Sequence, residues 1–245
     1  MKILLASDVH NEYHDDLVEF IEGLDKTANV LVLAGDIDSH DRIADTLGVF
    51  CRAYPQVVFV PGNHEFYGTS TTILHNSLTA LQESISNLYY LHPDNPSVMI
   101  DGQHFLGSTL WYPDLPGNFR YRSGMSDFHK IQGFEPWVYE QNARFVENFL
   151  ELATEETIVV SHHLPTYDAV QPYWRGSGLN RFFVSECKKE IEEKQPKAWL
   201  HGHSHTPAEV TIGRTKICLN PRGYPGEGPY VETDPLFSSN YVLDI

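Results

Sequence analysis

The 245-residue sequence has few cysteines and few basic residues, and both shortages narrow its function. Its three cysteines, Cys51, Cys187 and Cys218, lie far apart without a C-x-x-C pair, so nothing indicates a disulfide framework or a thiolate zinc site. We expect them to be small core residues in a reducing compartment. Only 17 lysines and arginines face 33 acidic residues, which gives a formal net charge of −16. This charge disfavours nucleic-acid binding, which depends largely on Lys and Arg that neutralise phosphates.

Long apolar stretches are also missing. The run at residues 3–6 is too short for a signal peptide, and no later stretch reaches the length of a membrane span. We therefore expect a cytoplasmic protein without a membrane partner. The acidic charge suits a protein that binds cations, although acidic surfaces also simply keep proteins soluble. No repeat, linker or low-complexity tract divides the chain, so we expect a single domain over residues 1–245.

The first quarter of the chain alternates short apolar runs with amphipathic segments. The pattern predicts buried strands at 3–6, 30–34 and 57–60, and helices at 15–24 and 40–54. Strands in such an alternation run parallel and are joined by crossover helices. The carboxyl ends of neighbouring parallel strands lie together, and open α/β sheets place their sites there.

The rest of the chain mixes strands, helices and two aperiodic segments. The regular elements expected are a helix over 74–88, a hairpin turning at Asp101-Gly102, a helix over 136–153, a strand at 157–160, a helix over 182–194, a strand at 197–200, a hairpin over 209–219 and a terminal strand at 241–245. The segments 112–136 and 164–181 are expected to be loops over a site. Segment 112–136 could equally be a surface excursion without a role.

Polar residues follow five of the predicted strands. These blocks are Asp8-x-His10, Gly35-Asp36, Gly62-Asn63-His64-Glu65, His162-His163 and Gly202-His203-x-His205. Carboxylate, imidazole and amide oxygen without thiolate form a ligand set that suits Mn, Fe or Zn. Two residues apart on an extended strand end, Asp8 and His10 face the same way and can grip one ion. The last block alone could be a solvated polar turn, so the five together carry the prediction.

In this order the blocks resemble the calcineurin-like metallophosphoesterase superfamily over roughly residues 1–222. The resemblance implies an α/β fold in which two mixed sheets pack face to face with helices outside, a four-layer α/β/β/α sandwich. It also implies hydrolysis of a phosphate mono- or diester, a small-molecule substrate, by attack of a hydroxide that bridges two metal ions. Nothing in the sequence identifies the ester, the native metals or the oligomeric state.

The resemblance also assigns roles to residues. The expected ligands of the first ion are Asp8, His10, Asp36 and His205, and those of the second ion are Asp36, Asn63, His162 and His203. Asp36 has two oxygens and can bridge the ions. His64 is the expected catalytic residue, which faces the phosphate and stabilises charge or protonates the leaving oxygen. We expect Glu65 to be either a structural residue or a carboxylate that accepts a hydrogen bond from a metal-site imidazole.

Other candidates are weaker. The family usually ligates through the first histidine of a pair, so His163 is not an expected ligand. Asp38 and His40 stand where protein phosphatases of the superfamily carry an Asp-Arg pair, which disfavours a Ser/Thr protein phosphatase. Arg120, Arg122 and Arg175 lie in the two loops. A guanidinium suits phosphate, although loop arginines are commonly solvated.

Two other functions are compatible with the same blocks. One is a nuclease of the same superfamily, which the acidic charge and the lack of a Lys/Arg run disfavour. The other is a non-catalytic scaffold that uses this fold for protein binding. The presence of every expected ligand together with His64 favours an enzyme over the scaffold.

Overall fold

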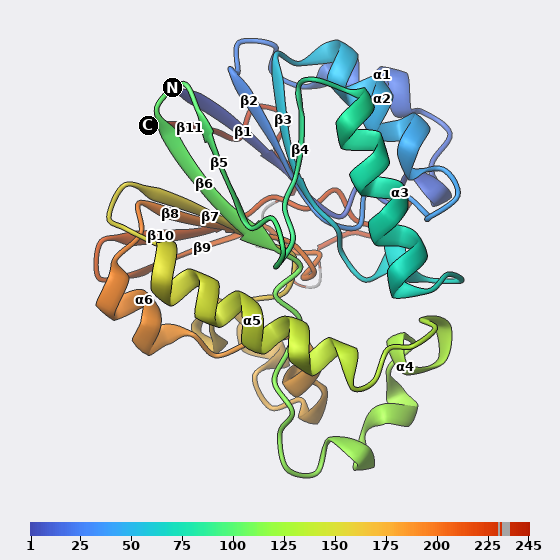
Figure 1. The fold of residues 1–245 in the computed structure, drawn as a ribbon, viewed down its shortest axis with the longest axis vertical. Coiled ribbons are helices and arrows are strands. Elements are labelled where there is room, and N and C mark those ends of the chain that lie inside the picture. Colours follow the sequence, from blue (N-terminus) through green and yellow to red (C-terminus); the bar gives the residue numbers. More distant parts are fainter. Residues whose placement is uncertain (230, 232–235) are drawn as a thin grey trace.

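Two β-sheets packed face to face form the centre of the computed structural model, which describes residues 1–229, 231 and 236–245 (Figure 1). The first sheet has the order β11-β1-β2-β3-β4 and the second β5-β6-β7-β8-β10-β9. The first sheet contains β1 (Lys2–Ala6), β2 (Val30–Ala34), β3 (Gln56–Val60), β4 (Leu88–Tyr90) and β11 (Val242–Asp244). The second contains β5 (Ser97–Ile100), β6 (Gln103–Ser108), β7 (Thr157–Ser161), β8 (Ala198–His201), β9 (Ala208–Ile212) and β10 (Thr215–Leu219).

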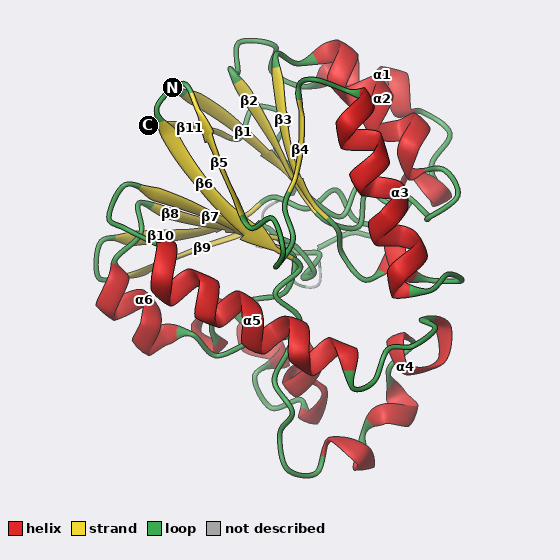
Figure 2. Ribbon diagram, in the orientation of Figure 1, coloured by secondary structure: helices red, strands yellow, loops and turns green. Residues whose placement is uncertain are grey.

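Helices cover the outer faces of both sheets (Figure 2). The first sheet is covered by α1 (Leu17–Gly23), α2 (Ile43–Ala53) and α3 (Thr71–Ser84), and the second by α5 (Trp137–Leu152) and α6 (Lys188–Lys194). A further short helix, α4 (Asp127–Lys130), lies within the 112–136 segment. The expected four-layer α/β/β/α sandwich is therefore confirmed.

Burial on two faces explains why the central strands are apolar throughout. In β2, Leu31 and Leu33 belong to the core on the helix side, whereas Val30, Val32 and Ala34 belong to the core between the sheets. Successive residues of a strand point to opposite faces, so both sets are fully covered. The parallel pairing of β1, β2 and β3 is confirmed.

Some element boundaries were wrong. The helix expected over 74–88 ends at Ser84, because Ile85 has extended backbone (φ −121°, ψ 104°), and Leu88 begins β4. The helix expected over 182–194 begins only at Lys188. In both cases the apolar residues outside the observed helix continue the helical spacing in the sequence, but they lie in a different element of the structure. All three cysteines are free and buried, and no helix in the described part of the chain has the length and apolar character that crossing a bilayer requires.

The core between the sheets should respond strongly to a cavity. Phe105 in β6 is fully buried there, while Met99 in the neighbouring strand β5 is 60% exposed. We expect Phe105→Ala to lower the free energy of unfolding by about 3–5 kcal/mol and Met99→Ala to change it by no more than about 0.5 kcal/mol. Urea unfolding of the two variants measures this. Equal losses would show that Phe105 is not part of a tightly packed layer.

Candidate metal centre

The carboxyl ends of β1, β2, β3, β7 and β8 converge on one group of polar side chains. The structure brings together all seven expected ligands, namely Asp8, His10, Asp36, Asn63, His162, His203 and His205. Among the described residues, three groups have ligand atoms within 4.8 Å of one another: Asp8 with His10 and His205, His10 with Asp36 and His64, and Asp36 with His162 and His203. Asp36 belongs to two of these groups, as expected for a bridging carboxylate.

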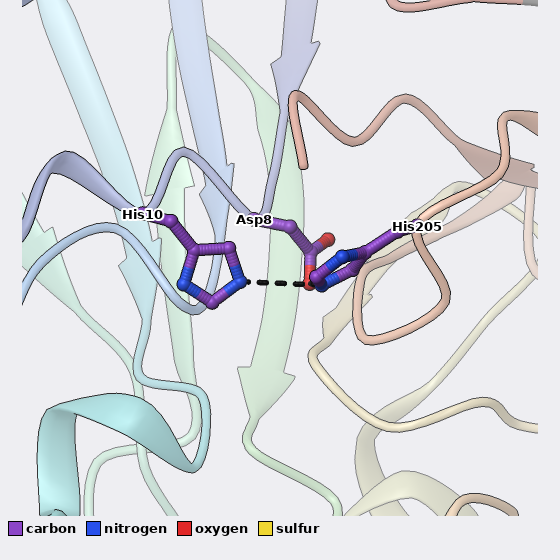
Figure 3. A group of neighbouring side chains, drawn as sticks. All are labelled: Asp8, His10 and His205. Atoms are coloured by element: carbon purple, nitrogen blue, oxygen red, sulfur yellow. Dashed lines mark hydrogen bonds and ion pairs between the residues drawn. The ribbon is translucent and has the colours of Figure 1, made fainter. Parts of the chain in front are cut away.

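The first half of the centre contains Asp8, His10 and His205 (Figure 3). Nε2 of His205 lies 3.2 Å from Nε2 of His10 and 3.5 Å from Oδ1 of Asp8. Nδ1 of His10 lies 3.1 Å from Glu12, and Nδ1 of His205 lies 2.7 Å from Glu227. With hydrogens on both Nδ1 atoms, two Nε2 lone pairs face each other and a carboxylate, an arrangement that only a cation stabilises.

The pKa of His205 also indicates that positive charge is favourable in this half of the centre. Burial alone lowers the pKa of His205, but its hydrogen bonds to Asp8 and Glu227 outweigh burial and raise the pKa to about 10. Without metal, a proton on His205 supplies the positive charge. A metal ion must displace this proton, so its affinity should depend on pH.

The second half of the centre contains Asp36, Asn63, His162 and His203. Nε2 of His162 lies 3.3 Å from Asp36 Oδ2, 3.1 Å from Asn63 Oδ1 and 3.1 Å from His203 Nδ1. Nδ1 of His162 donates to the carbonyl of Ala34 (2.9 Å), which leaves the lone pair of the neutral ring on Nε2. When the His162 ring is neutral, each of these four atoms can accept a hydrogen bond or bind a metal ion. The donor set of both halves therefore fits two metal ions.

The backbone at four of the expected ligands is strained. Asp8, His10, Asp36 and His203 have positive φ angles of 48°, 48°, 53° and 73°. Such conformations cost about 1–3 kcal/mol each in residues other than glycine and cluster at functional sites. Hydrogen bonds hold them: Asp8 N donates to Gly35 O (2.9 Å), His10 N to Asp36 O (2.9 Å) and His203 N to Asp8 Oδ1 (3.0 Å). Hydrogen bonds between neighbouring strand ends thus maintain these strained conformations.

Gly62 is required by close packing. A Cβ at this position would lie 2.2 Å from Asp36 Oδ1 and 2.7 Å from His162 Cε1. The glycine lets the end of β3 approach both halves of the centre.

Glu65 has the structural one of its two expected roles. Its carboxylate accepts backbone N–H groups of Gly62 (2.7 Å), Asp36 (3.0 Å) and Ile37 (2.6 Å), and no imidazole. Burial and the Asp36 carboxylate raise the pKa of Glu65, while these N–H donors stabilise its anion. It therefore ties the loop after β2 to the loop after β3.

His64 lies at the edge of the centre with its backbone N donating to Asp36 Oδ1 (2.8 Å). Its Nδ1 lies 2.9 Å from Glu12 Oε1 and its Nε2 lies 3.3 Å from the hydroxyl of Tyr224. Burial lowers the pKa of His64, but the Asp36 carboxylate and the Glu12 hydrogen bond outweigh it and the pKa is raised. The side chain is held in place and can carry a proton.

The sequence reasoning missed four supporting residues: Glu12, Glu227, Tyr67 and Asp127. Only Glu12 carried a signal, its position two residues after His10. The carboxamide of Asn63 donates to Tyr67 (2.7 Å) and to Asp127 (3.2 Å), and Tyr67 also donates to Asp127 (2.7 Å). Asp127 is fully buried, which raises its pKa to about 6. This network aims the Asn63 oxygen at His162.

The three loop arginines are not among the residues that line the cavity at this centre. Arg122 pairs with Glu135 (2.6 Å), Arg175 donates to the carbonyl of Val170 (3.2 Å) and Arg120 is exposed beside Phe119. Their contact with a substrate stays a prediction. Among the described residues, the lysine that lines the cavity is Lys130.

Asp127 should tune metal affinity through Asn63. We expect Asp127→Asn to weaken metal binding about 10–100-fold, because partners of ligands fix their orientation. Titration calorimetry with Mn²⁺ measures the change, and the matched control is Asp114→Asn, an exposed residue of the same segment. Equal affinities in wild type, Asp127→Asn and the control would contradict the orienting role.

Solved structures and one related sequence resemble this chain over nearly its whole length. It is similar to phosphopantetheinyl hydrolase from Mycobacterium tuberculosis, with a TM-score of 0.73, 18% identity, and 97% of this chain and 98% of that chain covered. A dimetal phosphatase from Danio rerio matches with a TM-score of 0.53, 13% identity, and 89% and 86% covered. The uncharacterized protein L509 of Acanthamoeba polyphaga mimivirus is 25% identical over 284 residues, covering 98% of this chain and all of that protein.

The structural likenesses, at these identities, bear on the fold alone. The family follows from the sequence. The family model of the calcineurin-like phosphoesterases matches residues 1–207, which contain all five blocks. The chain therefore belongs to the calcineurin-like phosphoesterase family.

Proposed function

We propose that this protein hydrolyses a phosphate mono- or diester with the help of two metal ions. The observation that supports this most is that Asp36 belongs to two groups of neighbouring ligand atoms, one with His10 and one with His162 and His203. Asp8, His10, Asp36 and His205 would hold the first ion, and Asp36, Asn63, His162 and His203 the second. Their imidazole, carboxylate and amide groups suit Mn, Fe or Zn. Two bound ions supply a water of lowered pKa and a clamp for the phosphate oxygens.

The residues of the chain have separate tasks in this proposal. Glu12 holds the imidazole of His64 through Nδ1, which leaves Nε2 on the cavity side near Tyr224. In the hydrolysis, the oxygen of water bonds to phosphorus and the bond from phosphorus to the alcohol oxygen breaks. His64 gives a proton to that departing oxygen, and the proton lost by water returns to the imidazole or to solvent.

Metal dependence is the direct test of the proposal. After chelation, we expect the protein to lose hydrolysis of p-nitrophenyl phosphate or bis-p-nitrophenyl phosphate, and added Mn²⁺ should restore it. The physical reason is that bound metal ions would lower the pKa of water and so supply the nucleophile at neutral pH. Protein that stays inert to both esters with Mn²⁺, Fe²⁺ or Zn²⁺ would favour the non-catalytic scaffold.

The His64 variant separates a catalytic role from metal binding. We expect His64→Ala to lower kcat about 10²–10⁴-fold, the range of general acid catalysis, with both metals retained in elemental analysis. This test matters because a ring nitrogen of His64 also lies within 4.8 Å of ligand atoms of His10 and Asp36. Loss of one metal ion in the variant would instead make His64 a ligand.

The nuclease of the same superfamily is less well supported. Among the described residues that line the cavity, Lys130 is the one lysine or arginine, and the chain carries a formal charge of −16. A substrate bound through many phosphates needs more cations than this.

A further inference from the structure

A cavity of about 510 Å³ opens directly beside the proposed metal centre. Asp36, Asn63, His64 and His205 form its inner end. Cavities of about 300–1,000 Å³ hold organic ligands of substantial size, so a phosphate group alone leaves most of this one empty. On the proposed function, the remaining space holds the alcohol part of the ester. The residues that line this space therefore indicate which kind of alcohol fits.

The outer walls come from the two long loops, which contact each other. A Cβ at Gly178 would lie 2.7 Å from Tyr121 Cε1, and the rings of Phe128 and Phe182 are 5.2 Å apart. The second loop is also fixed internally, since Asn180 donates to the carbonyl of Trp174 (2.9 Å). The cavity is therefore formed by two loops that pack against each other.

The walls combine apolar side chains with uncharged polar ones and a lysine. The apolar lining residues are Met125, Leu164, Val170, Trp174 and Leu179 of the loops and Phe183 just after the second loop, and the polar ones of the loops are Ser126, Lys130, Gln171, Ser177 and Asn180. Trp174 is 47% exposed and offers the largest apolar side chain of the lining. The apolar side chains favour an alcohol that buries hydrocarbon, and each methylene buried against them is worth about 10-fold or more in kcat/KM.

Away from the proposed ligands and His64, the described residues that line the cavity include one lysine and one carboxylate. Lys130 lines the cavity with its Nζ 4.6 Å from the centre of the Tyr67 ring, and the Glu227 carboxylate lines it as well. A second phosphate on the substrate would meet one ammonium and one carboxylate in a strongly acidic protein. Such a group would give up its hydration for little gain.

We propose that the substrate is the ester of a single phosphoryl group with a bulky, uncharged alcohol that contains a substantial hydrocarbon part. The loops 112–136 and 164–181 together form the subsite for that alcohol. This assignment rests on the proposed function and adds to it the chemical class of the leaving group. It also separates this protein from enzymes that act on nucleoside polyphosphates or on sugars with several phosphates.

Three esters of closely similar leaving-group reactivity test the proposal. They are the phosphates of 1-propanol, of 3-phenylpropan-1-ol, and of 1,3-propanediol carrying a second phosphate, assayed on metal-loaded full-length protein. All three release a primary alcohol, so differences in kcat/KM report the subsite. We expect the phenylpropyl ester to exceed the propyl ester at least 10-fold and the bisphosphate to fall below the propyl ester. If only bis-p-nitrophenyl phosphate is cleaved among activated esters, the series is made as methyl diesters.

Two variants assign the preference to the walls. Trp174→Ala should lower kcat/KM for the phenylpropyl ester about 10-fold and change the propyl ester less than about 3-fold. Leu179→Asp should do the same through a charge in the apolar wall. The matched control is Phe119→Ala, an aromatic residue of the first loop that is 66% exposed and does not line the cavity. Circular dichroism and metal content show whether each variant keeps the fold and the centre.

The outcomes separate this proposal from the proposed function. Equal rates for all three esters, with p-nitrophenyl esters cleaved, would overturn the apolar subsite and leave the phosphoesterase intact. Faster cleavage of the bisphosphate would overturn it in favour of an anion subsite at Lys130. A protein inert to every ester, including the activated ones, would contradict the proposed function itself.

Discussion

The structure depends on how the loops after the parallel strands are held against one another. The buried carboxylate of Glu65 accepts backbone N–H groups from the loop after β2 and from Gly62 after β3, and Gly223 N donates to Asp8 O at 2.9 Å. These bonds compensate for the positive φ angles of Asp8 and Asp36. Without them each loop would relax to an ordinary conformation, and the ligand atoms would separate.

The same packing concentrates acceptors. Carboxylates and imidazole lone pairs face each other across 3–4 Å, because Glu12, Glu227 and the Ala34 carbonyl occupy the opposite ring nitrogens of His10, His205 and His162. A protein interior tolerates this only with positive charge nearby. Burial lowers the pKa of His205, but Asp8 and Glu227 outweigh it and raise the pKa to about 10. Without metal, a proton on His205 therefore supplies positive charge that the metal ions of the proposed function would supply instead.

The sequence could predict the inner part of this arrangement and not its surroundings. Parallel strands bring their carboxyl ends together, so Asp36, Asn63 and His162 could be grouped from strand patterns alone. Leu88 could not be assigned to β4 from the sequence. A short apolar run looks the same whether it extends the apolar face of a helix or begins a buried strand. Asp127 and Glu227 lie in aperiodic segments, where contacts with residues 60 or 20 positions away follow no local pattern. Local pattern also could not show that Lys130, and not the three arginines, lines the cavity, because all four lie in these aperiodic segments.

The 112–136 segment contributes both to the candidate metal centre and to the cavity beside it. Its helix α4 begins at Asp127, which fixes the Asn63 carboxamide, and ends at Lys130, which lines the cavity. Met125, just before α4, belongs to the apolar wall. Under the proposed function, one folded unit thus orients a ligand of the second ion and shapes the space for the leaving group. A change in this segment that alters which alcohol fits should therefore also alter how tightly the second ion binds, so the proposed function couples substrate choice to metal affinity.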